Sequence, residues 1–186
     1  MERDLVREIN DLRRSPSAYA EKLVKNKQYF NDKKVWKHPD AEAGIKTEEG
    51  PAAYDEAILF LRTKAEPQET LTPSKGLNRV AADFLAAFQK DVEAKVDIGE
   101  VVQKYGEFTG NFRRLAQFGS PTAEQVIVNL VVCDGDKSRG HRDALLAPFL
   151  KKVGVAFGKH ETYKVCSVIV ACTTFDNKVD ADDTVN

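Results

Sequence analysis

The chain lacks the features that mark several classes of protein. Its 28 lysines and arginines are balanced by 29 acidic residues, so the net charge is −1. A balanced chain offers no electrostatic attraction to nucleic acid or acidic membranes, and we expect it to bind neither. No apolar stretch approaches the roughly 20 residues that cross a bilayer. Hydrophobic residues still make up 42% of the chain, which excludes disorder as its main state.

Cysteine is also scarce, since Cys133, Cys166 and Cys172 are the three in 186 residues. Cys166 and Cys172 fall on one predicted strand, where six residues span about 20 Å. A disulfide requires Cα atoms within about 7 Å of each other, so Cys166 and Cys172 do not form one. At most one disulfide, between Cys133 and one of the other two cysteines, is possible. Such cysteine usage favours reduced thiols in a reducing compartment.

The N-terminus has no signal-peptide core, because its first four residues, Met1-Glu2-Arg3-Asp4, include three charged ones. We therefore expect a cytoplasmic protein, or a secreted one if a leader preceded Met1.

Helical spacing of apolar residues dominates the first two thirds of the chain. Several of the predicted helices start where Gly or a small polar residue precedes proline, which is a common helix start. The polar, lysine-rich stretch 25–50 predicts a long surface loop. The predicted helices begin near residue 2, at Ser15-Pro16, from about Pro51, at Thr72-Pro73, near Ile98 and at Ser120-Pro121.

In the last third of the chain, the spacing of apolar residues changes from helical to alternating. Apolar residues alternate over 153–157 and again over 165–172, with a turn at 158–162, which predicts a β-hairpin. The second strand is apolar on both faces, and such a strand needs helices above and below it. The fold expected is α/β: a three-layer α/β/α sandwich around a small antiparallel sheet. We expect one domain over residues 1–175 and a solvated acidic tail over 176–186.

The densest chemistry lies between Cys133 and Arg142, where His141 follows Arg139-Gly140. A histidine at the mouth of a sheet can be a metal ligand or a base. Cys133 and His141 can also be read as a nucleophile and its base. The simpler interpretation of Cys133 is a small buried residue at the end of a helix.

This segment resembles a known signature. Ser-Arg-Gly-His-Arg at 138–142, followed by the strand residues Val153-Gly154-Val155, is similar to the CAP superfamily, named for cysteine-rich secretory, antigen-five and pathogenesis-related-one proteins. The opening of the chain resembles CAP members of eukaryotic microbes and algae, and the resemblance spans residues 5–175. It implies the same α/β/α sandwich. The matching opening residues are Ile9, Asn10, Arg13, Pro16, Tyr19 and Ala20.

The resemblance also implies a central cleft in which two histidines and two acids hold a divalent cation. His141 matches the second histidine, but Phe84 stands at the first, Arg114 at one acid and Cys133 at the other, with Asp134 adjacent. An arginine repels a cation and supplies no lone pair. We therefore expect a degenerate cleft with no metal and no cofactor.

The remaining polar residues of this cleft have two predicted arrangements. Arg114 pairs with Asp134 and closes the cleft, or His141 acts as a hydrogen-bonding strut toward Asp134 or a backbone carbonyl. His160 matches a turn position of the family, and we expect it to cap the backbone there.

The function expected is that of a non-catalytic interaction or structural module, not an enzyme. Its partners would be proteins of a larger assembly, such as a cytoskeletal or ciliary one. The alternative is a CAP protein that binds an apolar lipid such as a sterol or fatty acid, or a secreted CAP effector.

Overall fold

The computed structural model describes residues 1–31, 34–39 and 44–178, and the chain forms two compact units. The sheet unit comprises Met1–Val6, Thr70–Ala123 and the chain from Phe149 onward. The helical unit comprises Arg7–Glu69 and Glu124–Pro148. Both are assembled from segments far apart in sequence, and the prediction of one domain over residues 1–175 stays a prediction.

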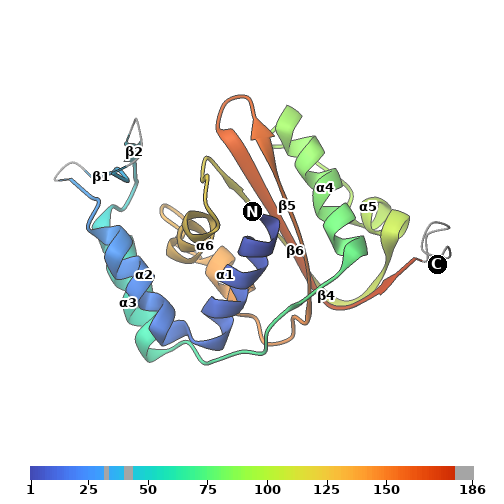
Figure 1. The fold of residues 1–186 in the computed structure, drawn as a ribbon, viewed down its shortest axis with the longest axis horizontal. Coiled ribbons are helices and arrows are strands. Elements are labelled where there is room, and N and C mark those ends of the chain that lie inside the picture. The colour runs from blue at the N-terminus through green and yellow to red at the C-terminus, as the bar shows by residue number, and fades with distance from the viewer. Residues whose placement is uncertain (32–33, 40–43, 179–186) are drawn as a thin grey trace. The chain divides into compact units, whose positions relative to one another are not determined.

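The sheet unit contains a four-stranded sheet with two helices on one face (Figure 1). The hairpin predicted near the C-terminus is confirmed as β5 and β6, and β4 pairs antiparallel with the other side of β6. The α/β class is thus confirmed, although the sheet is mixed, because β3 pairs parallel with β5. In sheet order the strands are β3 (Thr72–Pro73), β5 (Lys152–His160), β6 (Lys164–Asn177) and β4 (Gly106–Phe118), and the helices are α4 (Lys75–Lys90) and α5 (Ile98–Tyr105).

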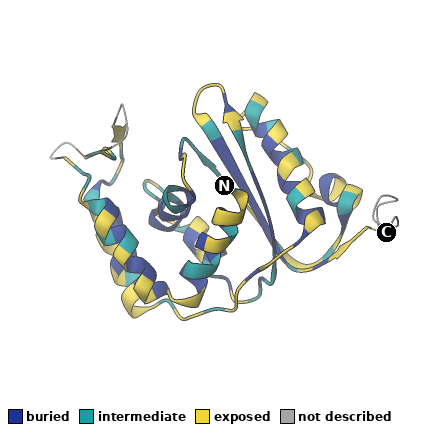
Figure 2. Ribbon diagram, in the orientation of Figure 1, coloured by how far each residue is buried: buried dark blue, intermediate teal, exposed yellow. Residues whose placement is uncertain are grey.

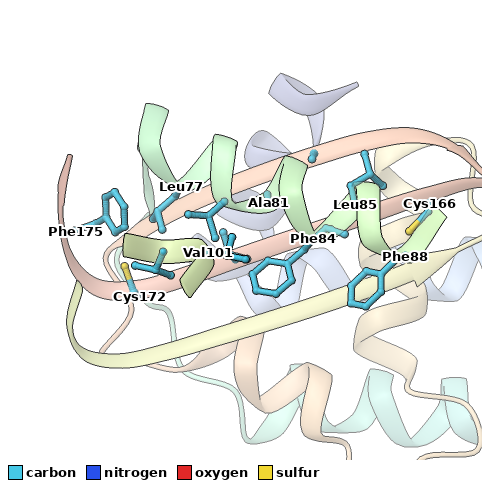
Figure 3. Packing of buried hydrophobic residues seen from close by; sticks show 14 residues of the cluster. Leu77, Ala81, Phe84, Leu85, Phe88, Val101, Cys166, Cys172 and Phe175 are labelled. Atoms are coloured by element: carbon cyan, nitrogen blue, oxygen red, sulfur yellow. The ribbon is translucent and has the colours of Figure 1, made fainter. Parts of the chain in front are cut away.

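The core of the sheet unit lies between α4 and β6 (Figure 3). Alternate residues of β6 face the helix, so Cys166 and Cys172 lie in the same buried cluster and are both free thiols, as predicted. The helix approaches β5 closely at Gly154, where a Cβ atom would lie 2.1 Å from the backbone of Leu77. The α4 side chains in this cluster are Leu77, Val80, Ala81, Phe84, Leu85 and Phe88.

Two strands of the four-stranded sheet, β3 and β4, were not predicted. β4 carries aromatic residues at Phe108, Phe112 and Phe118 that pack against the core cluster, but a bulge between Thr109 and Phe112 interrupts their alternation. The prediction that Thr72-Pro73 opens a helix was wrong. These two residues form β3, and α4 begins at Lys75 after a cap in which the Ser74 side chain accepts the backbone N–H of Leu77.

The helical unit is built largely on a pair of helices, α2 and α3, whose buried faces pack together (Figure 2). Tyr19, Ala20 and Leu23 line the buried side of α2, and Ala57 and Leu61 line that of α3. No helix among the described residues is long and apolar enough to cross a membrane. The elements are α1 (Glu2–Arg14), which crosses the boundary between the units, α2 (Pro16–Lys27), α3 (Pro51–Thr63), α6 (Ala123–Val132) and α7 (Gly140–Leu146).

The predicted surface loop over 25–50 contains more structure than expected. α2 extends to Lys27, and β1 (Val35–Trp36) pairs antiparallel with β2 (Ile45–Lys46). Residues 32–33 and 40–43 of this stretch lie outside the described residues. In the predicted acidic tail, β6 runs on through Asp176 to Asn177, and residues 179–186 lie outside the described part.

Candidate functional site

A buried arginine fixes the end of α7. Arg13 is fully buried, and its Nη1 donates to the carbonyls of Leu145 at 2.7 Å and Ala147 at 3.1 Å. Its Nε donates to the carbonyl of Glu69 at 2.8 Å. Burial lowers the pKa of this guanidinium from its usual value. Arg13, one of the residues that carry the family resemblance, therefore has a structural role.

The dense segment of the sequence forms a tight connection between α6 and α7, which we call the 133–139 loop. Three of its residues have left-handed backbone conformations: Cys133 at φ 51°, Gly135 at φ 80° and Arg139 at φ 55°. Residues other than glycine rarely adopt this region, because the Cβ atom crowds the backbone. Contacts with neighbouring segments must therefore hold the loop in place.

Arg139 bonds both to a neighbouring segment and to the loop itself. Its Nη1 and Nη2 donate to the two carboxylate oxygens of Glu49 at 2.7 and 2.8 Å. Nη1 also donates to the carbonyls of Cys133 at 2.8 Å and Asp136 at 3.1 Å. The backbone N–H of Gly135 donates to Glu49 at 2.9 Å. The bond from Arg139 holds the pKa of Glu49 at about 2.

Asp134 ties the same loop to the segment before α3. Its carboxylate accepts the backbone N–H of Glu48 at 2.7 Å and that of Glu49 at 2.9 Å. Both oxygens of Asp134 are thus engaged by the backbone of the helical unit. The predicted ion pair of Asp134 with Arg114 is not needed to explain its position.

A second bidentate pair supports α7 itself. The guanidinium of Arg142 is 1% exposed and donates to both carboxylate oxygens of Glu56, at 2.8 and 2.7 Å. Its Nε donates to the carbonyl of Val131 at 2.7 Å, and its guanidinium lies over the ring of Phe60 at 4.9 Å. The hydrogen bonds from Arg142 lower the pKa of Glu56. The Gly-His-Arg motif therefore contributes a buried arginine to a structural ion pair whose carboxylate, from Glu56, is exposed.

Three side chains of different chemistry meet at the start of α7. The ligand atoms of Cys133, Asp136 and His141 all lie within 4.8 Å of one another. The Cys133 thiol is buried and donates to the carbonyl of Leu130 at 2.9 Å. Burial raises its pKa, whereas reactive cysteines are exposed and have a lowered one. The Cys133–His141 pair thus has the proximity of a nucleophile and base but not the activated thiol.

The residues at the family's other two positions lie in the sheet unit. Phe84 is buried in the core, and Arg114 stacks over its ring at 4.8 Å and over that of Phe88 at 5.2 Å. Neither Phe84 nor Arg114 offers a lone pair for a cation. The structure brings Phe84 and Arg114 together in one unit, and Cys133, Asp134 and His141 in the other. The family's set of four ligands does not fit this chain.

The two remaining histidine predictions differ in outcome. His160 accepts the backbone N–H groups of Thr162 and Tyr163 on its Nδ1, each at 3.2 Å, so the predicted cap of this turn is confirmed. The prediction that His141 acts as a hydrogen-bonding strut toward Asp134 or a backbone carbonyl was wrong. Its side chain is exposed, because it starts a helix at the surface and both oxygens of Asp134 are already engaged.

Sequence reasoning missed three acids of this site: Glu49, Glu56 and Asp136. The arginine partners of Glu49 and Glu56 lie 90 and 86 residues away in the chain. Asp136 lies within the segment that was singled out. Its spacing from Cys133 and His141, Cys-x₂-Asp-x₄-His, is the signal that identifies a cluster of ligands.

No family model matches this chain, and no curated protein matches it. A solved structure, that of an outer surface protein from Borrelia burgdorferi, is similar with a TM-score of 0.46 and 15% sequence identity. The similarity covers 68% of this chain and 90% of that one. Membership of the CAP superfamily therefore stays a prediction.

Proposed function

We propose that this chain is a non-catalytic interaction module that binds an extended segment of a protein partner along the outer edge of β4. The observation that carries this proposal is the edge itself. β4 is 13 residues long and stands last in the sheet order, and within the described residues no strand pairs with its outer side. An unpaired edge presents backbone donors and acceptors that another strand can satisfy.

The pairing register identifies which groups face outward. The backbone N–H of Gly119 donates to the carbonyl of Val165 on β6 at 2.9 Å. Because inward and outward groups alternate along an antiparallel strand, the even-numbered residues from 112 to 118 direct their N–H and C=O groups away from β6. Side chains of the strand occupy two of these carbonyls, since Arg113 donates to Phe112 and Gln117 to Phe118. Arg114 and Ala116 form the centre of the open edge.

The charge of the edge indicates what kind of segment it binds. Arg113 and Arg114 are adjacent and both exposed. Across a pair of strands, opposite side chains lie about 5 Å apart, and opposite charges there stabilise the pairing. Because adjacent residues of a strand point to opposite faces of the sheet, we infer an extended partner segment with one acidic residue opposite Arg113 and another opposite Arg114.

The absence of catalysis is part of the same proposal. Asp134, Glu49, Glu56 and Arg142 are all engaged in bonds that hold the helical unit together. Cys133 is buried with a raised pKa. These engagements support a scaffold that presents a surface rather than a reacting centre. A cytoplasmic setting in a cytoskeletal or ciliary assembly, and the lipid-binding alternative, stay predictions.

The experiment compares Ala116→Pro with Ala116→Val in cells that express the full chain. Proline removes the outward N–H and is tolerated on an edge strand, whereas valine keeps the N–H. A photo-crosslinking residue placed at Asn111, which is exposed on β4 and carries no charge, reports contact with the partner, and one placed at the exposed Glu93 serves as the control position.

We expect the crosslink from position 111 to persist in Ala116→Val and to disappear in Ala116→Pro, while both variants keep the thermal unfolding transition of the unmodified chain. A crosslink that survives the proline would overturn the edge as the binding surface. A crosslink solely to a second copy of this chain would show self-association and contradict the claim of a distinct partner.

A further inference from the structure

We propose that Cys133, Asp136 and His141 form a binding site for a divalent metal ion, with Zn²⁺ as the best match. This inference concerns the helical unit and stands independently of the proposed role of β4. It revises the expectation of no metal, which considered the family's four positions and not Asp136.

The donor set selects the class of metal. A thiolate, an imidazole and a carboxylate offer one soft, one intermediate and one hard ligand atom. Zn²⁺ accepts all three types and is commonly held by three protein ligands with a fourth position open to water. Mg²⁺ and Ca²⁺ take oxygen ligands and are disfavoured by the cysteine and histidine.

The geometry of the site is close to that of a bound ion. The three ligand atoms lie within 4.8 Å of one another, and those of a tetrahedral zinc site are separated by about 3.5 Å, given bonds of about 2.0–2.3 Å. Cys133 is buried and fixed, whereas the His141 side chain is exposed. Because the imidazole is exposed, it can rotate to bring its nitrogen toward the other two ligand atoms.

Neighbouring groups hold two of the ligands in place. Arg139 donates to the backbone carbonyls of both Cys133 and Asp136, at 2.8 and 3.1 Å. The Asp136 Oδ1 atom accepts the N–H of Ser138 at 2.9 Å and its hydroxyl at 2.6 Å, which orients the carboxylate. Such supporting bonds are typical of metal sites, because they preset the direction of the ligand atoms. Arg139 is itself fixed by Glu49.

Binding requires one change at the thiol. The S–H group of Cys133 donates to the carbonyl of Leu130 without the metal. When the sulfur binds the ion as a thiolate, this proton leaves to the solvent. The ion then has sulfur, nitrogen and oxygen ligands, and its fourth position faces the surface beside His141.

The experiment titrates the reduced full chain with Co²⁺, a spectroscopic substitute for zinc, and then displaces it with Zn²⁺. We expect one ion per chain, an absorption band from thiolate-to-cobalt charge transfer, and a higher melting temperature with zinc. The variants are Cys133→Ser, Asp136→Asn and His141→Gln, and the controls are Asp143→Asn and His38→Gln, which change the same residue types outside the cluster.

We expect each of the three ligand variants to weaken Co²⁺ binding at least about tenfold, and Cys133→Ser to abolish the charge-transfer band, while the controls bind as the unmodified chain does. Because His141 is exposed, His141→Gln tests the site even if the buried Cys133→Ser unfolds. No band and no shift of the melting temperature would overturn the proposal. So would binding that survives His141→Gln or is lost equally in the controls.

Discussion

Arg139 and Glu49 lie 90 residues apart in the sequence and form a bidentate ion pair with N–O distances of 2.7 and 2.8 Å. Through this pair, the segment before α3 holds the left-handed loop that carries Cys133 and Asp136. The arrangement explains how a loop with two non-glycine residues in the left-handed region stays folded: the guanidinium bridges a carboxylate and two carbonyls of the loop.

The ion pair predicts a pH dependence of stability. The pKa of Glu49 is about 2 in the folded chain against a usual value of 4.5. A folded pKa below the unfolded one contributes stability that is fully present above pH 4.5 and is lost as the pH falls toward 2. We expect Glu49→Gln to lower the free energy of unfolding by about 1 kcal/mol at pH 7, a modest value because the pair is partly exposed.

Urea unfolding at a series of pH values measures this effect, with Glu48→Gln as the matched control on the exposed neighbour. The difference between Glu49→Gln and the unmodified chain should vanish near pH 2. A difference of the same size at pH 7 and at pH 2 would contradict the assignment.

Arg13 predicts a large loss of stability when its side chain is shortened or made apolar. Arg13→Met leaves three backbone carbonyls without their donor, and a buried acceptor that loses its partner costs about 1–3 kcal/mol. We expect Arg13→Met to lower the free energy of unfolding by more than about 3 kcal/mol. The exposed neighbour Arg14 is the control, and Arg14→Met should change stability by less than about 0.5 kcal/mol. Equal effects of the two substitutions would show that the carbonyl contacts matter little.

The cysteines of β6 predict protection from alkylation. Burial raises the pKa of Cys166 and of Cys172 to about 11, so at pH 8 almost none of either thiol is the reactive thiolate. Mass spectrometry after iodoacetamide treatment should find both unmodified in the folded chain and both modified in urea. Rapid labelling of the folded chain, or a disulfide between them, would contradict the packing of β6 against α4.

The spacing of apolar residues along the chain predicted much of the fold. Apolar residues at helical spacing located α4, and alternation located β5 and β6, because in both cases a single buried face imposes its period on the sequence. β4 was not predicted because the bulge near Gly110 shifts the pairing register between Phe108 and Phe112 and so interrupts the alternation of apolar residues. β3 was not predicted because two residues are too few to show an alternation of apolar and polar side chains.

The candidate site was less accessible to sequence reasoning. The segment around Cys133 and His141 stood out by composition, but its supporting acids lie far away in the chain, and no local pattern links Glu49 to Arg139. The family resemblance directed attention to Phe84 and Arg114, which pack against each other in the sheet unit. Asp136 was overlooked because the family pattern has no ligand at its position.

The central claim is that β4 binds a strand of a partner protein. Its most direct test is residue-resolved hydrogen exchange of β4 in the isolated chain and in the purified assembly of the chain with the partner that the crosslink captures. The outward N–H groups of Arg114 and Ala116 should exchange rapidly in the isolated chain and at least about tenfold more slowly in the assembly. The inward N–H groups of Arg113 and Leu115, already bonded to β6, should change little. Outward N–H groups that exchange equally fast in both states would contradict the account.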